Sequence, residues 1–135
     1  MKHIIITIRS YSKYLLVIWV LTILSISSIP DLPSPKIETG GYTIRIDYIF
    51  HFCEYGILAF LALLTFVKED FRAGLKKYLI ITVSLILFAL ADEFHQMIIP
   101  RRTFNVKDIL SNIAGILAAL VYCTIMFRKI EKNMI

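Results

Sequence analysis

Four apolar segments, each near the length of a membrane span, take up more than half of this 135-residue chain. A helix needs about 20 predominantly apolar residues to cross a hydrocarbon core about 30 Å thick. Three segments of that length cover about residues 48–67, 78–99 and 108–127, and a shorter first segment covers about residues 12–29. With 58% hydrophobic residues, the chain is too apolar for a soluble domain. The sequence predicts a single all-α domain over residues 1–135, a polytopic membrane bundle of four transmembrane helices.

The 15 lysine and arginine residues are unevenly distributed around these segments. Three lie before Tyr14, at or ahead of the start of the first segment, four lie in the loop 68–77, and three follow Phe127. These regions share one side of a four-span bundle, and the positive-inside rule assigns that side to the cytoplasm. We therefore expect a multi-pass protein of the cell membrane with both termini cytoplasmic. Arg101, Arg102 and Lys107 lie in a short outer loop, where lipid headgroup anchoring and a dedicated anion site are equally good explanations.

Ionisable and amide side chains interrupt three of the four segments. A charged side chain at the bilayer centre costs about 2.5–3.5 kcal/mol, so such groups face a bundle interior or a watery cavity. The i, i+4, i+7 spacing of Asp47, His51 and Glu54 places them on one helix face. The third and fourth segments carry, at the same expected depth, Asp92, Glu93, His95, Gln96, Asp108 and Asn112. The sequence therefore predicts one polar pocket that opens to the extracytoplasmic side under the loop 100–107.

These residues suggest two kinds of role. Burial could tune the pKa of His51, Glu54, Asp92 and Glu93, which makes them candidate catalytic acid–base groups. Arg102, together with Arg101, would hold a phosphate through bidentate hydrogen bonds. The other candidate ligand-binding residues are Asp47, Tyr55, His95, Gln96, Asp108 and Asn112. No paired nucleophile and base stands out, so the sequence favours ligand binding and leaves open whether the protein is an enzyme.

Each candidate also has a structural explanation. Asp47 and Asp108 begin helices, where an acidic residue can cap the N-terminus. His51 and Glu54 could form an internal pair that only stabilises the bundle. Gly115 is expected to serve close helix packing. The number of polar groups favours a functional site, because six or more on three helices at one depth exceed what a bundle of this size needs.

The spacing leaves a bound divalent metal open. The pairs His51-x-x-Glu54 and Asp92-x-x-His95 resemble the i, i+3 ligand pairs of carboxylate-bridged helical bundles. The neighbouring arginines would disfavour a dication, and no other cofactor is expected. Nucleic acid is not an expected partner, because the net charge of +5 mostly reflects topology and no basic stripe carries interleaved aromatic residues.

Four ordered motifs carry a resemblance to a known family. They read D-x-x-x-H-F-x-x-Y-G from Asp47, D-E-x-x-Q from Asp92, P-x-R from Pro100 and D-x-x-x-N-x-x-G from Asp108. Together they resemble the VanZ-like family of small bacterial-type membrane proteins, named for an accessory protein of low-level teicoplanin resistance. The resemblance implies a cell-envelope setting and a link to glycopeptide resistance.

This chain departs from the family pattern at two positions. Arg101 stands where the family often has glycine, which makes the outer loop more cationic. Tyr48 stands where the family often has lysine, which removes a cation beside Asp47. Ligand preference is therefore expected to differ from that of the founding member.

Two functions from different classes follow. In the first, the pocket binds, or acts on, an anionic envelope molecule such as a polyprenyl phosphate, another lipid-linked phosphate or an anionic glycan precursor, beside membrane lipid itself. In the second, the protein is a non-catalytic membrane module that shields envelope targets or partners another envelope protein. Its polar residues then only hold the helices together. The first predicts that His51→Gln abolishes activity but not folding, and the second predicts that folding is lost.

Overall fold

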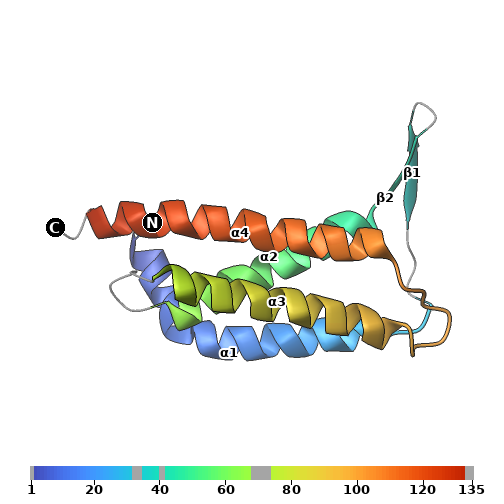
Figure 1. Ribbon diagram of the computed structural model, residues 1–135, viewed down its shortest axis with the longest axis horizontal. Coiled ribbons are helices and arrows are strands. Elements are labelled where there is room, and N and C mark those ends of the chain that lie inside the picture. Colours follow the sequence, from blue (N-terminus) through green and yellow to red (C-terminus); the bar gives the residue numbers. More distant parts are fainter. Residues whose placement is uncertain (1, 32–34, 40–41, 68–73, 133–135) are drawn as a thin grey trace.

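Four long helices form the protein, and a computed structural model describes residues 2–31, 35–39, 42–67 and 74–132 (Figure 1). The helices are α1 (Lys2–Ser27), α2 (Asp47–Phe66), α3 (Leu75–Gln96) and α4 (Val106–Lys132). Successive helices run in opposite directions, and α1 begins at the same end of the bundle where α4 ends (Figure 1). Each contains a candidate membrane span of 20 to 27 residues. The chain is thus an all-α, multi-pass membrane bundle.

We call the end where α1 begins and α4 ends the termini end, and the opposite end the hairpin end. The cations that predict a cytoplasmic termini end include Lys68 and Arg72, which lie outside the described residues. The assignment of this end to the cytoplasm stays a prediction.

The first helix is longer than the sequence predicts. It begins at Lys2 instead of near residue 12, and its candidate membrane span is Thr7–Ser27. No glycine or proline precedes Pro30, so nothing in this segment interrupts a helix. Ser12, near the expected start, lies buried within the helix, and its hydroxyl donates to the backbone carbonyl of Arg9. The third helix begins and ends three residues earlier than expected, directly after Gly74.

The segment between α1 and α2 contains a β-hairpin that sequence reasoning missed. Strand β1 (Lys36–Thr39) pairs antiparallel with β2 (Tyr42–Arg45) at the hairpin end of the bundle (Figure 1). The alternation of apolar and polar residues in these short strands is the signal that could have revealed them. A backbone bond of 2.9 Å from Ile46 N to Pro35 O closes the base of the hairpin. Helix α2 therefore begins directly where the hairpin ends.

Helices α2 and α4 form the central pair of the bundle, and Gly115 sets their approach. A Cβ atom at Gly115 would lie 2.1 Å from the carbonyl oxygen of Phe52 and 3.0 Å from the backbone nitrogen of Gly56. Real Cβ contacts are never as short as the first of these, so only glycine fits. The packing role expected for Gly115 is confirmed.

Helix α1 packs beside α2 and is tied to it at both halves. The Trp19 indole donates a hydrogen bond of 2.9 Å to the backbone oxygen of Glu54. At the termini end, the Arg9 guanidinium donates to the backbone oxygen of Val67. The last carbonyls of a helix lack partners within the helix, so Arg9 compensates the end of α2.

Candidate functional site

His51 joins α2 to α4 at the hairpin end. Its Nδ1 lies 3.1 Å from Asn112 Oδ1, and because an amide oxygen only accepts, Nδ1 is assigned as the donor. Its Nε2 lies 3.7 Å from Asp108 Oδ2. The two side chains of that pair are only 13% and 8% exposed. The close approach of the two helices at Gly115 brings His51 and Asn112 together. Asn112 lies one turn before Gly115 on α4, and His51 directly precedes Phe52 on α2.

A second chain of hydrogen bonds connects α1, α2 and α3. The Tyr55 hydroxyl donates to Asp92 Oδ2 over 3.0 Å. The Gln96 amide donates to the same oxygen over 3.4 Å and to the Ser27 hydroxyl over 3.3 Å. All four residues are buried. The structure thus brings together three residues that the sequence singled out, and it adds Ser27, which no sequence pattern indicates.

Glu93 and Asn105 hold the loop after α3 against the bundle. Glu93 is fully buried, and its Oε1 accepts a bond of 2.7 Å from the backbone N–H of Asn105. The Asn105 side-chain oxygen accepts from the backbone N–H of Lys107 over 3.0 Å, which is the geometry of a helix N-cap. Asn105 was missed, although an asparagine directly before an apolar helix is a recognised cap signal.

Asp47 and Asp108 lie in the first turns of α2 and α4, as expected, but neither is the N-cap residue. Asn105 caps α4, and the Asp108 carboxylate instead faces His51. At α2 the N-cap residue is Ile46, which makes no side-chain cap bond, and Asp47 forms an ion pair with Arg45. That hydrogen-bonded pair raises the pKa of the Arg45 guanidinium above its ordinary value. Both carboxylates are thus used in side-chain pairs, because the basic side chains of Arg45 and His51 lie near them.

The two loop arginines have different partners. Arg102 Nη2 donates to the backbone oxygens of Ile26 and Ser27, over 3.1 and 3.4 Å, and so compensates the last carbonyls of α1. Arg101 pairs with Asp31, and the two side chains are 77% and 52% exposed. Arg102 therefore points into the bundle end, whereas Arg101 lies on its surface.

Electrostatic interactions show that the buried groups occupy one region. Glu93 interacts with Asp92, Asp108 and Arg102, and half-buried Glu54 interacts with Asp92 and Arg102. Side chains from α2, α3, α4 and the loop thus share one electrostatic environment. We call this group the polar cluster; its members are His51, Glu54, Tyr55, Asp92, Glu93, Gln96, Arg102, Asn105, Asp108 and Asn112.

Several buried atoms of this region have no hydrogen-bond partner. Three are carboxylate oxygens of Asp92, Glu93 and Asp108. The others are nitrogens: Nε of Arg102, Nδ2 of Asn105, Nδ2 of Asn112 and Nδ1 of nearby His95. Most buried polar atoms in proteins are paired, so a cluster of seven such atoms marks unused capacity for both donating and accepting hydrogen bonds.

The spacing of the polar residues left a metal site in this cluster open. Among the described residues, no group of three histidine, cysteine, aspartate or glutamate side chains is arranged to hold a metal ion. The His51 ring is directed at Asn112 and Asp108, so the pair His51-x-x-Glu54 does not converge with Asp92-x-x-His95 into a ligand set. The described residues therefore do not fit the divalent metal that the spacing left open.

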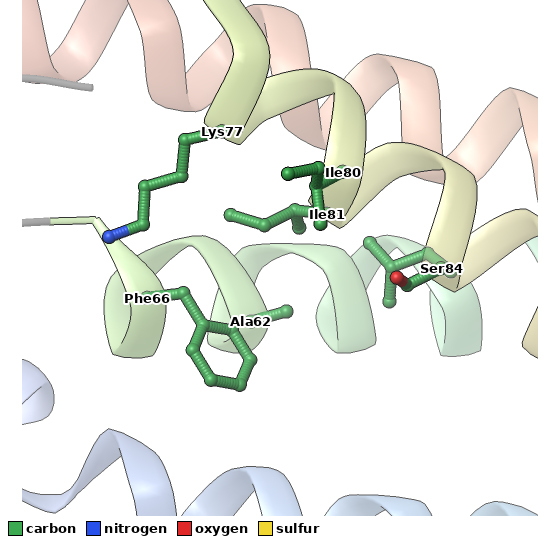
Figure 2. A pocket seen from close by; sticks show the side chains of 7 residues that line it. Ala62, Phe66, Lys77, Ile80, Ile81 and Ser84 are labelled. Carbon is green, nitrogen blue, oxygen red and sulfur yellow. The ribbon is translucent and has the colours of Figure 1, made fainter. Parts of the chain in front are cut away.

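An apolar groove in the described part of the protein lies away from the polar cluster. It runs between α2 and α3 in the termini half of the bundle (Figure 2), whereas the polar cluster occupies the hairpin end. The outward-facing pocket at the cluster stays a prediction.

Comparison with known proteins agrees with the motifs. The model of the VanZ/LLP1 family matches residues 5–127, which include most of α1, all of α2 and α3 and most of α4. No curated protein and no solved structure matches the chain significantly. The match spans every residue of the polar cluster and confirms the resemblance carried by the four motifs. The chain belongs to the VanZ/LLP1 family.

Proposed function

We propose that this VanZ/LLP1 membrane protein binds a lipid-linked phosphate or a related anionic envelope precursor through its polar cluster, on the extracytoplasmic side of the cell membrane. The observation that carries the proposal is the set of seven buried polar atoms without partners at the hairpin end. A buried polar atom left unpaired costs about 1–3 kcal/mol, so a ligand that pairs several of them gains affinity.

The chemistry of these atoms favours a particular kind of ligand. The Nε of Arg102 and the amide nitrogens of Asn105 and Asn112 are suitable donors for phosphate oxygens. The unpaired carboxylate oxygens of Asp92 and Glu93 would repel a bare phosphate, but they accept hydrogen bonds from hydroxyl or ammonium groups. A phosphate linked to a sugar or an amino group offers both kinds of partner. The proposed ligand is therefore a lipid-linked glycan precursor rather than free phosphate.

We propose that the protein binds this ligand, and we assign it no catalysed reaction. The Nδ1 of His51 donates to Asn112, which leaves Nε2 beside the Asp108 carboxylate and available to exchange a proton. Glu54 and Asp92 are further acid–base candidates at the same end. Transfer of a group would also need a nucleophile, and we assign none.

A second function has its own support. His51 with Asn112, and Tyr55 with Asp92, link α2 to its neighbours through direct side-chain bonds. Such bonds between membrane helices contribute about 0.6 kcal/mol on average. On this alternative the cluster only holds the bundle together, and the protein acts as a non-catalytic module that shields envelope targets or partners another envelope protein.

Thermal unfolding of the purified protein in detergent, with and without polyprenyl phosphate and its sugar-linked form, separates the two functions. A ligand at about 100 times its dissociation constant adds about 2.7 kcal/mol of stability. We expect this gain in wild type and in Arg101→Gln, whose side chain is on the surface, and its loss in Arg102→Gln and Glu93→Gln.

The control without ligand is equally informative. One result would reject ligand binding and favour the structural function. In that result neither compound stabilises wild type, and Arg102→Gln and Glu93→Gln unfold even when no ligand is added. Equal stabilisation by free phosphate would reject the lipid-linked ligand.

A further inference from the structure

An apolar groove lies between α2 and α3 in the termini half of the bundle (Figure 2). Its volume is about 330 Å³, within the range of about 300–1,000 Å³ that is typical of ligand sites. Two residues of α2 and five of α3 line it, namely Ala62, Phe66, Lys77, Ile80, Ile81, Ser84 and Leu85. The groove exists because α2 packs chiefly on α4 and α1 while α3 packs chiefly on α4, and because small Ala62 and Ser84 do not fill the space between them.

The lining selects a hydrocarbon occupant. Water in a cavity needs two to four polar partners, and this groove offers only the Ser84 hydroxyl and the Lys77 ammonium group. Both α2 and α3 are candidate membrane spans, so the surroundings of the groove are hydrocarbon. An acyl chain therefore matches it, whereas a polar ligand does not.

Lys77 is the charged residue of the lining, and it stands in the first turn of α3 beside Lys76. Cations are unfavourable there, because the N-terminus of a helix carries partial positive charge. In the described part of the chain, no acidic side chain pairs with Lys77. An anion bound at Lys77 would compensate both the lysines and the helix end.

The order of these groups along α3 corresponds to that of a phospholipid. At about 1.5 Å per residue, Lys77 and Leu85 are separated by about 12 Å along the helix axis. Lys77 lies at the end of the membrane span, where its ammonium group can reach the interface, and the aliphatic lining continues from it toward the middle of the span. A phosphate at the interface and an acyl chain below it have the same arrangement.

We propose that the groove between α2 and α3 binds one acyl chain of an anionic phospholipid whose phosphate pairs with Lys77. The site is at the opposite end of the bundle from the polar cluster and shares no residue with it. The proposal therefore stands or fails independently of the proposed function.

Native mass spectrometry of the purified protein tests this with phosphatidylglycerol and phosphatidylcholine that carry the same acyl chains. We expect wild type to bind phosphatidylglycerol more tightly. Lys77→Gln should weaken that binding about fivefold, the effect of one lysine near an anionic surface. The matched control Lys76→Gln, one residue away and not in the lining, should change it little.

A second pair of variants tests the acyl chain. Ser84→Phe places a ring in the groove and should reduce binding of both lipids, whereas Val83→Phe, on the adjacent exposed position, should not. Ser84 is itself exposed, so the variant is expected to fold, which circular dichroism checks.

Four outcomes would overturn the proposal. Equal binding of the two lipids by wild type would remove the role of charge. Equal effects of Lys76→Gln and Lys77→Gln would indicate diffuse attraction to the surface. No effect of Ser84→Phe would place the lipid elsewhere, and dimers lost in Ser84→Phe would identify a second copy of the chain as the occupant.

Discussion

Gly115 of α4 lies so close to Phe52 of α2 that a Cβ atom on the glycine would stand 2.1 Å from the phenylalanine carbonyl oxygen. This contact fixes how far α4 is shifted and rotated against α2. His51 and Asn112 are near neighbours of these two residues in sequence, and their side chains are 3.1 Å apart as a result. The geometry of the polar cluster thus depends on a residue that carries no functional group.

Replacement of Gly115 should therefore be costly. We expect Gly115→Ala to lower the free energy of unfolding by about 1–3 kcal/mol, the usual range for overpacking. The matched control is Gly56→Ala, whose Cβ would come no closer than 3.5 Å to a neighbour and which gains about 0.5–1 kcal/mol from the helix propensity of alanine. Unfolding in mixed micelles measures both. Similar stabilities for the two variants would contradict the close approach.

Replacement of Arg101 by glycine should not destabilise the protein. Its φ angle is 63°, in the left-handed region that costs an ordinary residue about 1–2 kcal/mol. The exposed ion pair with Asp31 is worth only about 0.2–1 kcal/mol. Arg101→Gly should thus leave stability unchanged or raise it slightly, whereas Arg101→Val should lower it by about 1–2 kcal/mol, since β-branched residues tolerate this region least. Thermal unfolding in detergent compares the two, and a stable valine variant would argue against the left-handed turn.

Removal of the Tyr55 hydroxyl should weaken the contact between α2 and α3. Tyr55→Phe leaves Asp92 Oδ2 with only the longer bond from Gln96. Interhelical bonds of this kind contribute about 0.6 kcal/mol and at most about 1.7 kcal/mol in membranes, so a loss in that range is expected. Tyr122→Phe is the control, because Tyr122 is 56% exposed on α4. Equilibrium unfolding decides, and equal stability of both variants would mean that the Tyr55–Asp92 bond adds nothing.

The cap of α4 should depend on Asn105 and not on Asp108. Asn105→Ala removes the acceptor for the Lys107 N–H and should cost about 0.5–2 kcal/mol. Asn105→Asp keeps an acceptor at the cap and is expected to retain most of the stability. Hydrogen exchange at the first turn of α4 gives the readout. Fast exchange in Asn105→Ala and not in Asp108→Ala supports the assignment, whereas fast exchange in Asp108→Ala alone would assign the cap to Asp108.

The orientation in the membrane can be measured by labelling. We expect a cysteine at Ile37, which is 50% exposed in the hairpin, to react with an impermeant maleimide on whole cells. A cysteine at Lys132, exposed at the termini end, should react only after lysis. Cys53→Ala removes the exposed native cysteine. The reverse pattern would place the termini outside and move the polar cluster to the cytoplasmic side.

The sequence by itself determined the number of helices, their approximate spans and the end of the bundle at which the polar residues gather. These properties are local, because the length of an apolar run decides whether a helix spans the membrane and the i, i+4 spacing decides which residues share a face. The four motifs likewise indicated the VanZ-like family, which the match over residues 5–127 confirms. A sequence signal also existed for Asn105 and for the hairpin, and it was missed.

Only the tertiary structure decided which polar groups meet. Asp108 faces His51 where the sequence predicted a cap. Arg102, the predicted phosphate ligand, donates through Nη2 to carbonyls at the end of α1, a contact that the sequence did not indicate. The reason is that side-chain partners depend on the rotation and shift of one helix against another. In this protein the contact of Gly115 with Phe52 sets that shift for α2 and α4, and hydropathy contains no information about it. The groove between α2 and α3 also depends on tertiary packing. It is the space left between these helices when both pack on α4.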